Sequence, residues 1–541
     1  MTRFALAMAL LAAGFTAADD KDLVGRWPLA GDAIDSSGNG LHAINQGVTF
    51  LARGPAVKTR TATFNGTGSH LRVKSAPGLR LGTEDFSVAL WLRPDDGHGD
   101  LVTLYDAKRR RGLNLSLRTN TGVTTSQPNT RQLQFGIDAG AEPKWADEGR
   151  PGNAVIAFAL TVHDGHLYAG TAANGKDDVG RVYRYDGPGR WTDRGAPDRC
   201  NAISALAVHE GKLYAATSKY RFAGSALEES KNTNPGGGIY RLEGGRWVEV
   251  GRLPNTEAVG GLAVYKGRLY ATSLYRPAGF FRYEADGKWS SLPVPDGKRV
   301  ESLGVFNGHL WATSYDGGRV YRYDGAAWHD MGQLGDNTQT YSFAVHRGRL
   351  CVGTWPSGKV FRWDDKSWED IGRLGEELEV MGMLVHNGQL YAGTLPLAEV
   401  YRYDGGQSWA KVGRLDKTPA VRYRRAWTMA QYKGRLYCST LPSGHIHSLE
   451  AGPCVTYDRE LAPGWRHVAA VKHGGRLRLF VDGKPVAESA AFDPAKFDVS
   501  CDEPLLIGAG TGDYFRGDLS DVRLYRRALS AEEVGRLYKA K

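Results

Sequence analysis

The chain has 541 residues, of which 41% are hydrophobic and 24% charged, the ordinary balance of a soluble folded protein with room for several domains. Its 70 glycines suit a turn-rich, all-β chain. The net charge of +10 is dispersed among acidic residues, so we expect no nucleic-acid partner, whereas an acidic glycan suits it. The five cysteines form no C-x-x-C pair, which excludes the usual zinc and redox motifs.

The first residues, MTRFALAMALLAAGFTAADD, have the pattern of a secretory signal: an arginine, a short apolar run and small residues. We expect residues 1–18 to be cleaved and the protein to be secreted, periplasmic or at the cell surface, with no membrane span. In an oxidising compartment Cys454 and Cys501 could form a disulfide; free buried thiols are the alternative.

Residues 141–452 contain seven near-copies of one unit, for example GLAVYKGRLYATSLYRPAGFFRYEADGKWSSLPVP from Gly261 to Pro295. A leucine in each unit marks the repeat: Leu167, Leu213, Leu269, Leu310, Leu350, Leu390 and Leu436. A tryptophan closes each unit: Trp145, Trp191, Trp247, Trp289, Trp328, Trp368 and Trp409. Four short strand-like runs in roughly 40–45 residues predict a seven-bladed β-propeller.

The two markers do not pair in chain order, because Trp145 precedes every leucine and Leu436 is followed by no tryptophan of its own unit. We therefore predict that the strand around Trp145 is the outer strand of the seventh blade, whose other strands lie near Trp427 to Glu450. This pairing would close the ring and bring residues 143 and 452 together.

The flanking segments, residues 19–140 and 453–541, have strand-length apolar runs without this repeat. Six of their motifs, in order, resemble the laminin-G-like (concanavalin A-like) jelly-roll domain: WPLAGDAIDSSGNG, FNGTGSHL, FSVALWLRP, WRHVAAV, LFVDG and LSDVRLYRRALS. The resemblance implies one jelly-roll sandwich split by the propeller, because a ring with adjacent ends fits into a surface loop. The propeller resembles kelch and galactose-oxidase-like propellers but lacks the kelch Gly-Gly pair.

The DAIDSSGNG loop offers oxygen ligands from Asp32, Asp35 and Asn39 of the kind that Ca²⁺ prefers. By resemblance to laminin-G-like domains, Asp521 would complete a structural calcium site. The alternative is an Asx-turn network without metal.

The loops on one propeller face are the second candidate site, since exposed loops on a rigid scaffold often carry binding. They include a long insert, Ser218 to Gly238, and aromatic and arginine side chains that suit an acidic sugar. The predicted ligand-binding residues are Tyr220, Arg221, Tyr275, Arg276, Tyr315, Tyr341, Trp355, Arg422, Tyr423, Arg424 and Trp427. The alternative is that they fill the channel rim and bind nothing specific.

No catalytic residues are predicted. Glu301, Asp316, Tyr341, Arg422 and Arg424 could serve a sialidase-like site, but the S-x-D-x-G-x-x-W boxes of that family are absent. We therefore expect a non-enzymatic binding or adhesion protein for a carbohydrate or glycoprotein. A glycan-active hydrolase or lyase is one alternative, and a cell-surface scaffold for protein contacts is another.

Overall fold

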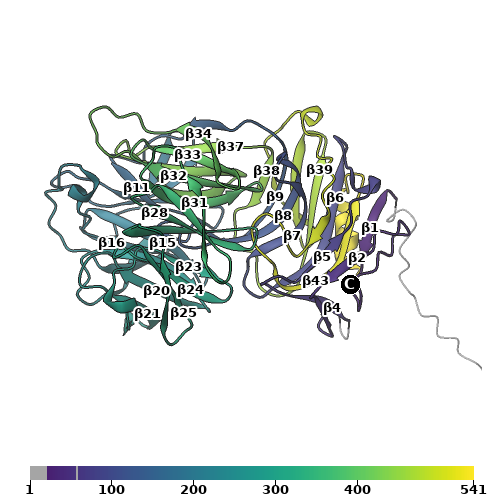
Figure 1. Ribbon diagram of the computed structural model, residues 1–541, viewed down its shortest axis with the longest axis horizontal. Coiled ribbons are helices and arrows are strands. Elements are labelled where there is room, and N and C mark those ends of the chain that lie inside the picture. Colours follow the sequence, from purple (N-terminus) through teal and green to yellow (C-terminus); the bar gives the residue numbers. More distant parts are fainter. Residues whose placement is uncertain (1–20, 57–58, 541) are drawn as a thin grey trace, which may run out of the picture.

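The computed structural model describes residues 21–56 and 59–540; the predicted signal peptide lies outside the described residues. The described chain is almost entirely β-structure. Its strands form two parts side by side (Figure 1): a propeller-like ring, in teal and green, and a two-sheet sandwich, in purple and yellow. No described helix is long and apolar enough to cross a membrane.

The ring has seven four-stranded antiparallel blades, and each strand follows the repeat seen in the sequence. Blades one and two are β11 (Ile156–His163), β12 (His166–Ala172), β13 (Val182–Gly187), β14 (Arg190–Asp193), then β15 (Ala202–His209), β16 (Lys212–Ser218), β17 (Gly238–Glu243) and β18 (Arg246–Arg252). Blades three and four are β19 (Val259–Tyr265), β20 (Arg268–Ser273), β21 (Phe280–Ala285), β22 (Lys288–Leu292), then β23 (Leu303–Phe306), β24 (His309–Thr313), β25 (Arg319–Tyr323) and β26 (Trp328–Gln333). Blades five and six are β27 (Gln339–His346), β28 (Arg349–Trp355), β29 (Lys359–Trp363), β30 (Trp368–Arg373), then β31 (Glu379–His386), β32 (Gln389–Leu395), β33 (Glu399–Gly405) and β34 (Ser408–Arg414). Blade seven is β35 (Arg425–Tyr432), β36 (Arg435–Leu441), β37 (Ile446–Glu450) and, from before blade one, β10 (Lys144–Asp147).

The ring closes across its two ends. Strand β10 pairs with β37, with Trp145 opposite Leu449, so the strand pairing predicted for Trp145 is confirmed. The first strand of each blade contacts that of the next, and β35 contacts β11 to complete the circle. The closing tryptophans join the blades, because each indole N–H donates to a backbone carbonyl of the preceding blade, at 2.8–3.1 Å.

The sandwich uses strands from both ends of the chain. One sheet contains β1 (Leu23–Trp27), β3 (Thr49–Leu51), β4 (Thr61–Asn65), β6 (Phe86–Pro94), β39 (Arg466–His473), β40 (Arg476–Val481), β41 (Lys484–Glu488) and β43 (Arg516–Tyr525). The other contains β2 (Ala43–Gln46), β5 (His70–Val73), β7 (Gly99–Asp106), β8 (Arg111–Asn120), β9 (Asn129–Ala139), β38 (Cys454–Tyr457) and β42 (Leu505–Ile507). Early and late strands alternate: β6 lies between β39 and β43, and β42 lies between β5 and β7.

A single hydrophobic core fills the space between the two large sheets. Phe86 of β6 meets Phe135 of β9 edge to face at 6.0 Å, and both are fully buried. The short helix α1 (Ala531–Lys539) has Ser530 as its N-cap, and Ser530 and Glu533 form a capping box. All five cysteines are free and buried, so Cys454 and Cys501 are not bonded to each other.

The hairpin connecting β8 to β9 leaves the sandwich and enters the sandwich-facing mouth of the ring. We call residues 121–128 the plug. It exchanges hydrogen bonds with six blades, through Thr161, Leu206, Leu262, Ser302, Phe343 and Thr428. Val123 of the plug is 2% exposed and packs in one cluster with Leu384 and Tyr391 of the remaining blade, blade six. The plug therefore contacts all seven blades and fixes the ring to its host.

Candidate functional site

The ring has one free end, which we call the loop-rich face. There the inner strands begin, and the connections between second and third strands emerge at residues 173–181, 219–237, 274–279, 314–318, 356–358, 396–398 and 442–445. The opposite end holds the plug and faces the sandwich. A ligand that enters the ring can therefore approach only from the loop-rich face.

The inner strand of six blades is irregular at the same repeat position, where the register with the second strand shifts. Such bulges re-aim side chains and often adjoin binding sites. The residues at this position are Phe158, Ser204, Gly260, Tyr341, Met381 and Trp427, and the equivalent residue of blade four is Glu301. Five of the six bulges therefore carry a side chain at this end of the ring, whereas blade three has Gly260 there.

The seven aromatic residues predicted for ligand binding gather in one cluster. Tyr220, Tyr341 and Trp427 are buried, whereas Tyr275, Tyr315, Trp355 and Tyr423 are partly exposed around them. Tyr315 meets Tyr341 edge to face at 5.5 Å, and Trp355 meets Tyr423 at 6.1 Å.

Trp427 is 3% exposed, and its indole N–H donates to the carbonyl of Phe158 at 2.9 Å. Its ring centroid lies 4.9 Å from that of Phe158. It supports the cluster from within and offers no face to a ligand, so the exposed platform consists of the four partly exposed rings.

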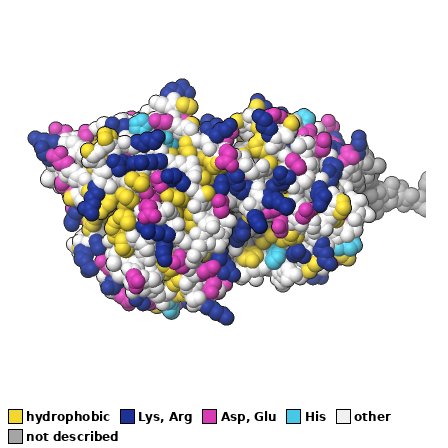
Figure 2. All heavy atoms as spheres, turned by 45° about the horizontal axis from the view of Figure 1, so that its top comes forward, with side chains coloured by type: hydrophobic (Ala, Val, Ile, Leu, Met, Phe, Trp, Pro, Cys, Tyr) yellow, Lys and Arg dark blue, Asp and Glu magenta, His cyan; other side chains and the backbone are white. Residues whose placement is uncertain are grey.

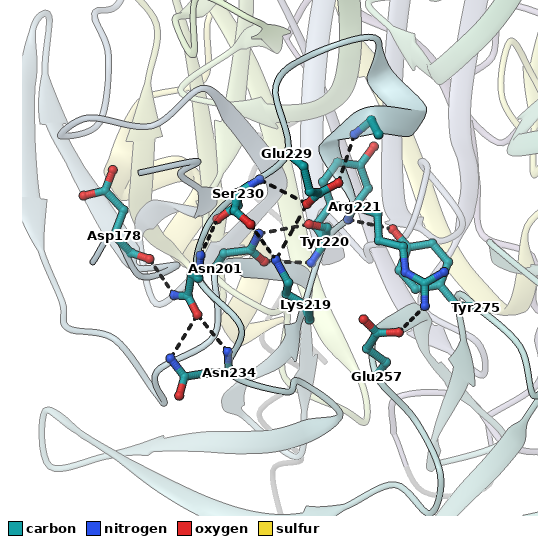
Figure 3. Close-up of polar contacts among 12 residues, drawn as sticks. Asp178, Asn201, Lys219, Tyr220, Arg221, Glu229, Ser230, Asn234, Glu257 and Tyr275 are labelled. Carbon is teal, nitrogen blue, oxygen red and sulfur yellow. Dashed lines mark hydrogen bonds and ion pairs between the residues drawn. The ribbon is translucent and has the colours of Figure 1, made fainter. Parts of the chain in front are cut away.

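The predicted arginines surround this platform. The Arg221 guanidinium lies 4.5 Å from the Tyr275 ring centre and forms an ion pair with Glu257 (Figure 3). Arg276 Nη2 lies 3.4 Å from Asp316 Oδ2.

On the other side of the platform, Arg422 lies over the ring of Tyr423 at 4.8 Å, and Arg424 Nε donates to the carbonyl of Thr418 at 2.6 Å. Within the described residues no carboxylate forms an ion pair with Arg422 or Arg424. The blade-seven side of the platform is therefore uncompensated positive charge, which suits an anionic ligand group.

The insert of blade two has a defined conformation. Figure 3 shows Asn201 beneath it: the Asn201 amide donates to the carbonyl of Tyr220 at 2.9 Å and accepts from its N–H at 2.7 Å. Lys219 Nζ reaches the carbonyl of Ser230 at 3.3 Å and Glu229 at 3.7 Å. These bonds hold Tyr220 and Arg221 at the edge of the platform.

Three charged side chains lie inside the ring at this end. Glu301 is fully buried, and neither of its carboxylate oxygens has a hydrogen-bond partner in the structure. Glu379 is 3% and Arg425 7% exposed, and Nε and Nη1 of Arg425 also have no partner. Buried charges cost free energy, so such a group usually has a functional reason.

Burial raises the pKa of Glu301 well above its usual range, and the charge of Glu379 adds to this effect. Burial raises the pKa of Glu379 to about 7, although the charge of Arg425 and the hydroxyl of Tyr341 oppose the shift. The two carboxyl groups are therefore close enough to affect each other's ionisation.

Glu379 was not among the residues singled out in the sequence, although the repeat contains a signal for it. At its position blades one to three have Ile156, Ala202 and Ala258. Glu301 likewise stands where other blades have Phe158 or Met381. Because the blade folds with an apolar residue there, the charges are not needed for the fold.

The predicted calcium ligands do not form an open site. Asp35 accepts hydrogen bonds from the backbone N–H groups of Arg26, Ser37 and Leu41 at 2.9 Å each, which lower its pKa against the effect of burial. Asp521 forms ion pairs with Arg26 and Arg523, and Asp32 accepts from the N–H of Ile34.

The Arg26 guanidinium thus supplies the positive charge where a cation was expected. In the described part of the chain no group of three or more His, Cys, Asp or Glu residues could hold a metal. Hydrogen bonds and ion pairs within the chain occupy these aspartates in this arrangement, and the structural calcium site stays a prediction beside the alternative of an Asx-turn network.

Comparison with known proteins finds a family similarity in one segment of the chain. Residues 449–535 match the model of the concanavalin A-like lectin/glucanases superfamily. No curated protein matches the chain.

Several solved structures resemble parts of the chain. Two are extracellular domains of a one component and a hybrid two component system, BT4673, from B. thetaiotaomicron. They share 13% and 12% identity, with TM-scores of 0.40 and 0.42 over 57% and 64% of this chain. This chain spans only 39% and 46% of their lengths. The WD40 β-propeller domain of Doa1 has 11% identity and a TM-score of 0.42, over 57% of this chain and 97% of that one.

Proposed function

We propose that this is an exported binding protein that recognises a carbohydrate or glycoprotein bearing acidic groups through the loop-rich face of the ring. The observation that carries the proposal is the platform of partly exposed aromatic rings beside the guanidinium groups of Arg422 and Arg424, which form no ion pair with a carboxylate of the described residues. Aromatic faces suit the apolar face of a sugar ring, and arginine suits a carboxylate or sulfate. The lectin-like sandwich match is consistent with a binding role.

The proposal includes the division of the chain. Residues 19–140 and 453–541 form one laminin-G-like jelly-roll sandwich, and residues 141–452 form a seven-bladed propeller inserted in it. The pairing of β6 with β39 and β43, and of β10 with β37, supports this division. Export rests on the signal-like sequence of residues 1–18.

Arg422→Ala and Tyr423→Ala are each expected to weaken binding to acidic glycans about 10-fold, since each removes a charge-assisted or stacking contact. The wild-type chain is screened on a glycan array, and affinities for the best acidic ligand are then measured by titration calorimetry. Arg349→Ala is the matched control, because Arg349 is exposed at the opposite end of its blade. Equal affinities for all four proteins would refute the proposed platform.

A second function, cleavage of a glycosidic bond, is favoured by Glu301 and Glu379. Two carboxyl groups with raised pKa values can act as acid and base in glycoside hydrolysis. Binding ranks first because both carboxyl groups are buried, so hydrolysis would require the surrounding aromatic side chains to move.

If the bound glycan is hydrolysed, Glu301→Gln and Glu379→Gln should each reduce kcat at least about 100-fold while glycan binding persists. Product analysis of the array ligand by mass spectrometry provides the measurement. Undiminished turnover in both variants would exclude this pair, and no turnover by the wild type would leave binding as the function.

A further inference from the structure

A cleft of about 620 Å³ lies between the sandwich and the ring, away from the loop-rich face. On the ring side it is lined by the equivalent first turns of three adjacent blades, residues 208–210, 264–267 and 305–308. On the sandwich side it is lined by residues 65–67, 95–98 and 513–516, and the base of the plug hairpin forms its floor. This volume suits a ligand of several sugar units, and ligand sites often occur at such junctions.

The cleft lining combines neutral hydrogen-bonding groups with charged side chains, and aromatic rings lie beside them. Asn65, Thr67 and Thr130 contribute amide and hydroxyl groups, and Asn307 extends from the blade-four turn. Tyr514 is partly exposed at the sandwich edge. Polar side chains arranged around a ring face are the usual means of binding sugar hydroxyls.

Two buried donors in the cleft wall have no partner. The backbone N–H of Thr119 donates to Nδ1 of His98 at 3.0 Å, so the neutral imidazole has its proton on Nε2. This Nε2 is buried without a hydrogen-bond partner, and the carboxylate of Asp513 is 3.8 Å away. Nη2 of Arg131 is also buried and unpartnered. Each donor could form a hydrogen bond with an acceptor that approached it from the cleft.

The basic side chains of the cleft lining (Arg131, Lys266, Arg516) are matched by a small excess of acidic ones (Asp95, Asp96, Glu210, Glu460, Asp513), so the cleft does not suit a strongly anionic ligand. Arg516 forms an ion pair with Asp96 at 3.2 Å, and Arg131 lies 3.9 Å from Glu460. Burial also lowers the pKa of His98 to about 3, so this side chain is uncharged at neutral pH. Both parts of the wall are therefore polar with little net charge. The blade-seven side of the platform differs, because its arginines are uncompensated.

We propose that this cleft binds a neutral oligosaccharide, held between the turns of blades two to four and the sandwich edge. Neither part of the protein contains the site alone, so the ligand contacts both. The cleft is separate from the loop-rich face, and one chain can therefore hold an acidic and a neutral glycan at opposite ends of the ring.

Two variants test the proposal without disturbing the fold. Thr67→Trp fills the cleft from an exposed turn. Asn307→Gly removes an amide at a position with φ of 48°, which glycine adopts without strain. Asn255→Gly is the matched control, because Asn255 has φ of 51° and lies outside the cleft.

The probes are hexamers of glucose, xylose, mannose, galactose and N-acetylglucosamine, titrated into the full chain by calorimetry. The wild type should bind at least one of them, and Thr67→Trp and Asn307→Gly should each weaken that binding at least about 10-fold. Asn255→Gly and Arg422→Ala should bind like the wild type.

Two results would overturn the proposal: no hexamer binds to the wild type at millimolar concentration, or a bound hexamer is unaffected by both cleft variants. Loss of hexamer binding in Arg422→Ala alone would assign the neutral sugar to the loop-rich face. If the cleft proposal fails while Arg422→Ala still weakens binding of the acidic glycan, the proposed function stands without it.

Discussion

Val123→Asp is expected to destabilise the protein by about 3–5 kcal/mol, because it places an unpaired charge in the interior of the ring. Val123 is 2% exposed, at the tip of the plug, and shares a cluster with Leu384 and Tyr391 of blade six. Differential scanning calorimetry is the measurement, and it should show a lower Tm for the ring in the variant.

Two further variants show whether the loss of stability comes from the buried position of Val123 or from the introduction of an aspartate anywhere in the ring. Val123→Ala removes only methyl groups and should cost about 1–2 kcal/mol. Val248→Asp replaces a valine that is 41% exposed on blade two, and it should leave the Tm nearly unchanged. If Val123→Asp and Val248→Asp behave alike, the plug does not stabilise the ring.

Glu379→Gln is expected to stabilise the protein, relative to the wild type, increasingly as the pH rises. Burial raises the pKa of Glu379 from 4.5 to about 7, so the folded protein holds this proton more tightly than the unfolded chain. The stabilisation of the folded protein by this proton is complete below about pH 4.5 and is lost as the pH rises through 7. The lost contribution is about 3 kcal/mol, and glutamine does not titrate.

The measurement is the Tm or free energy of unfolding of both proteins between pH 4 and pH 8, at roughly half-unit steps. Their difference should change by about 3 kcal/mol over this range in favour of the variant. Glu376→Gln, a change at an exposed glutamate three residues away, provides the control and should show a constant difference. Parallel curves for Glu379→Gln and the wild type would mean that Glu379 ionises normally.

The ring was predictable because its signals are local and repeated. Each blade contains the same turns and the same tryptophan, and the displaced Trp145 indicates the closing pair with blade seven. The seven predicted aromatic residues also come together, because the repeat places them all at the loop-rich end of their blades. The distribution of charge was visible too: acidic and basic side chains are interspersed over the face in Figure 2.

Other features depend on contacts that one sequence does not specify. The sequence of the plug, TGVTTSQP, resembles an ordinary polar turn, and only its insertion into the ring buries Val123 and Thr125. Asp35 and Asp521 resemble calcium ligands, but the sequence does not show that Asp35 accepts from the backbone N–H of Arg26 or that Asp521 pairs with the guanidinium of Arg26. The burial of Trp427 also arises from packing against Phe158 of another blade.

The plug has a consequence for biosynthesis. Residues 121–128 precede every blade in the chain, so the ribosome synthesises the plug before any blade of the ring. Either the blades assemble around the plug one after another, or the ring closes first and the plug enters it afterwards. The hydrogen bonds between the plug and six blades favour assembly around the plug, because each newly synthesised blade then finds a hydrogen-bond partner already present.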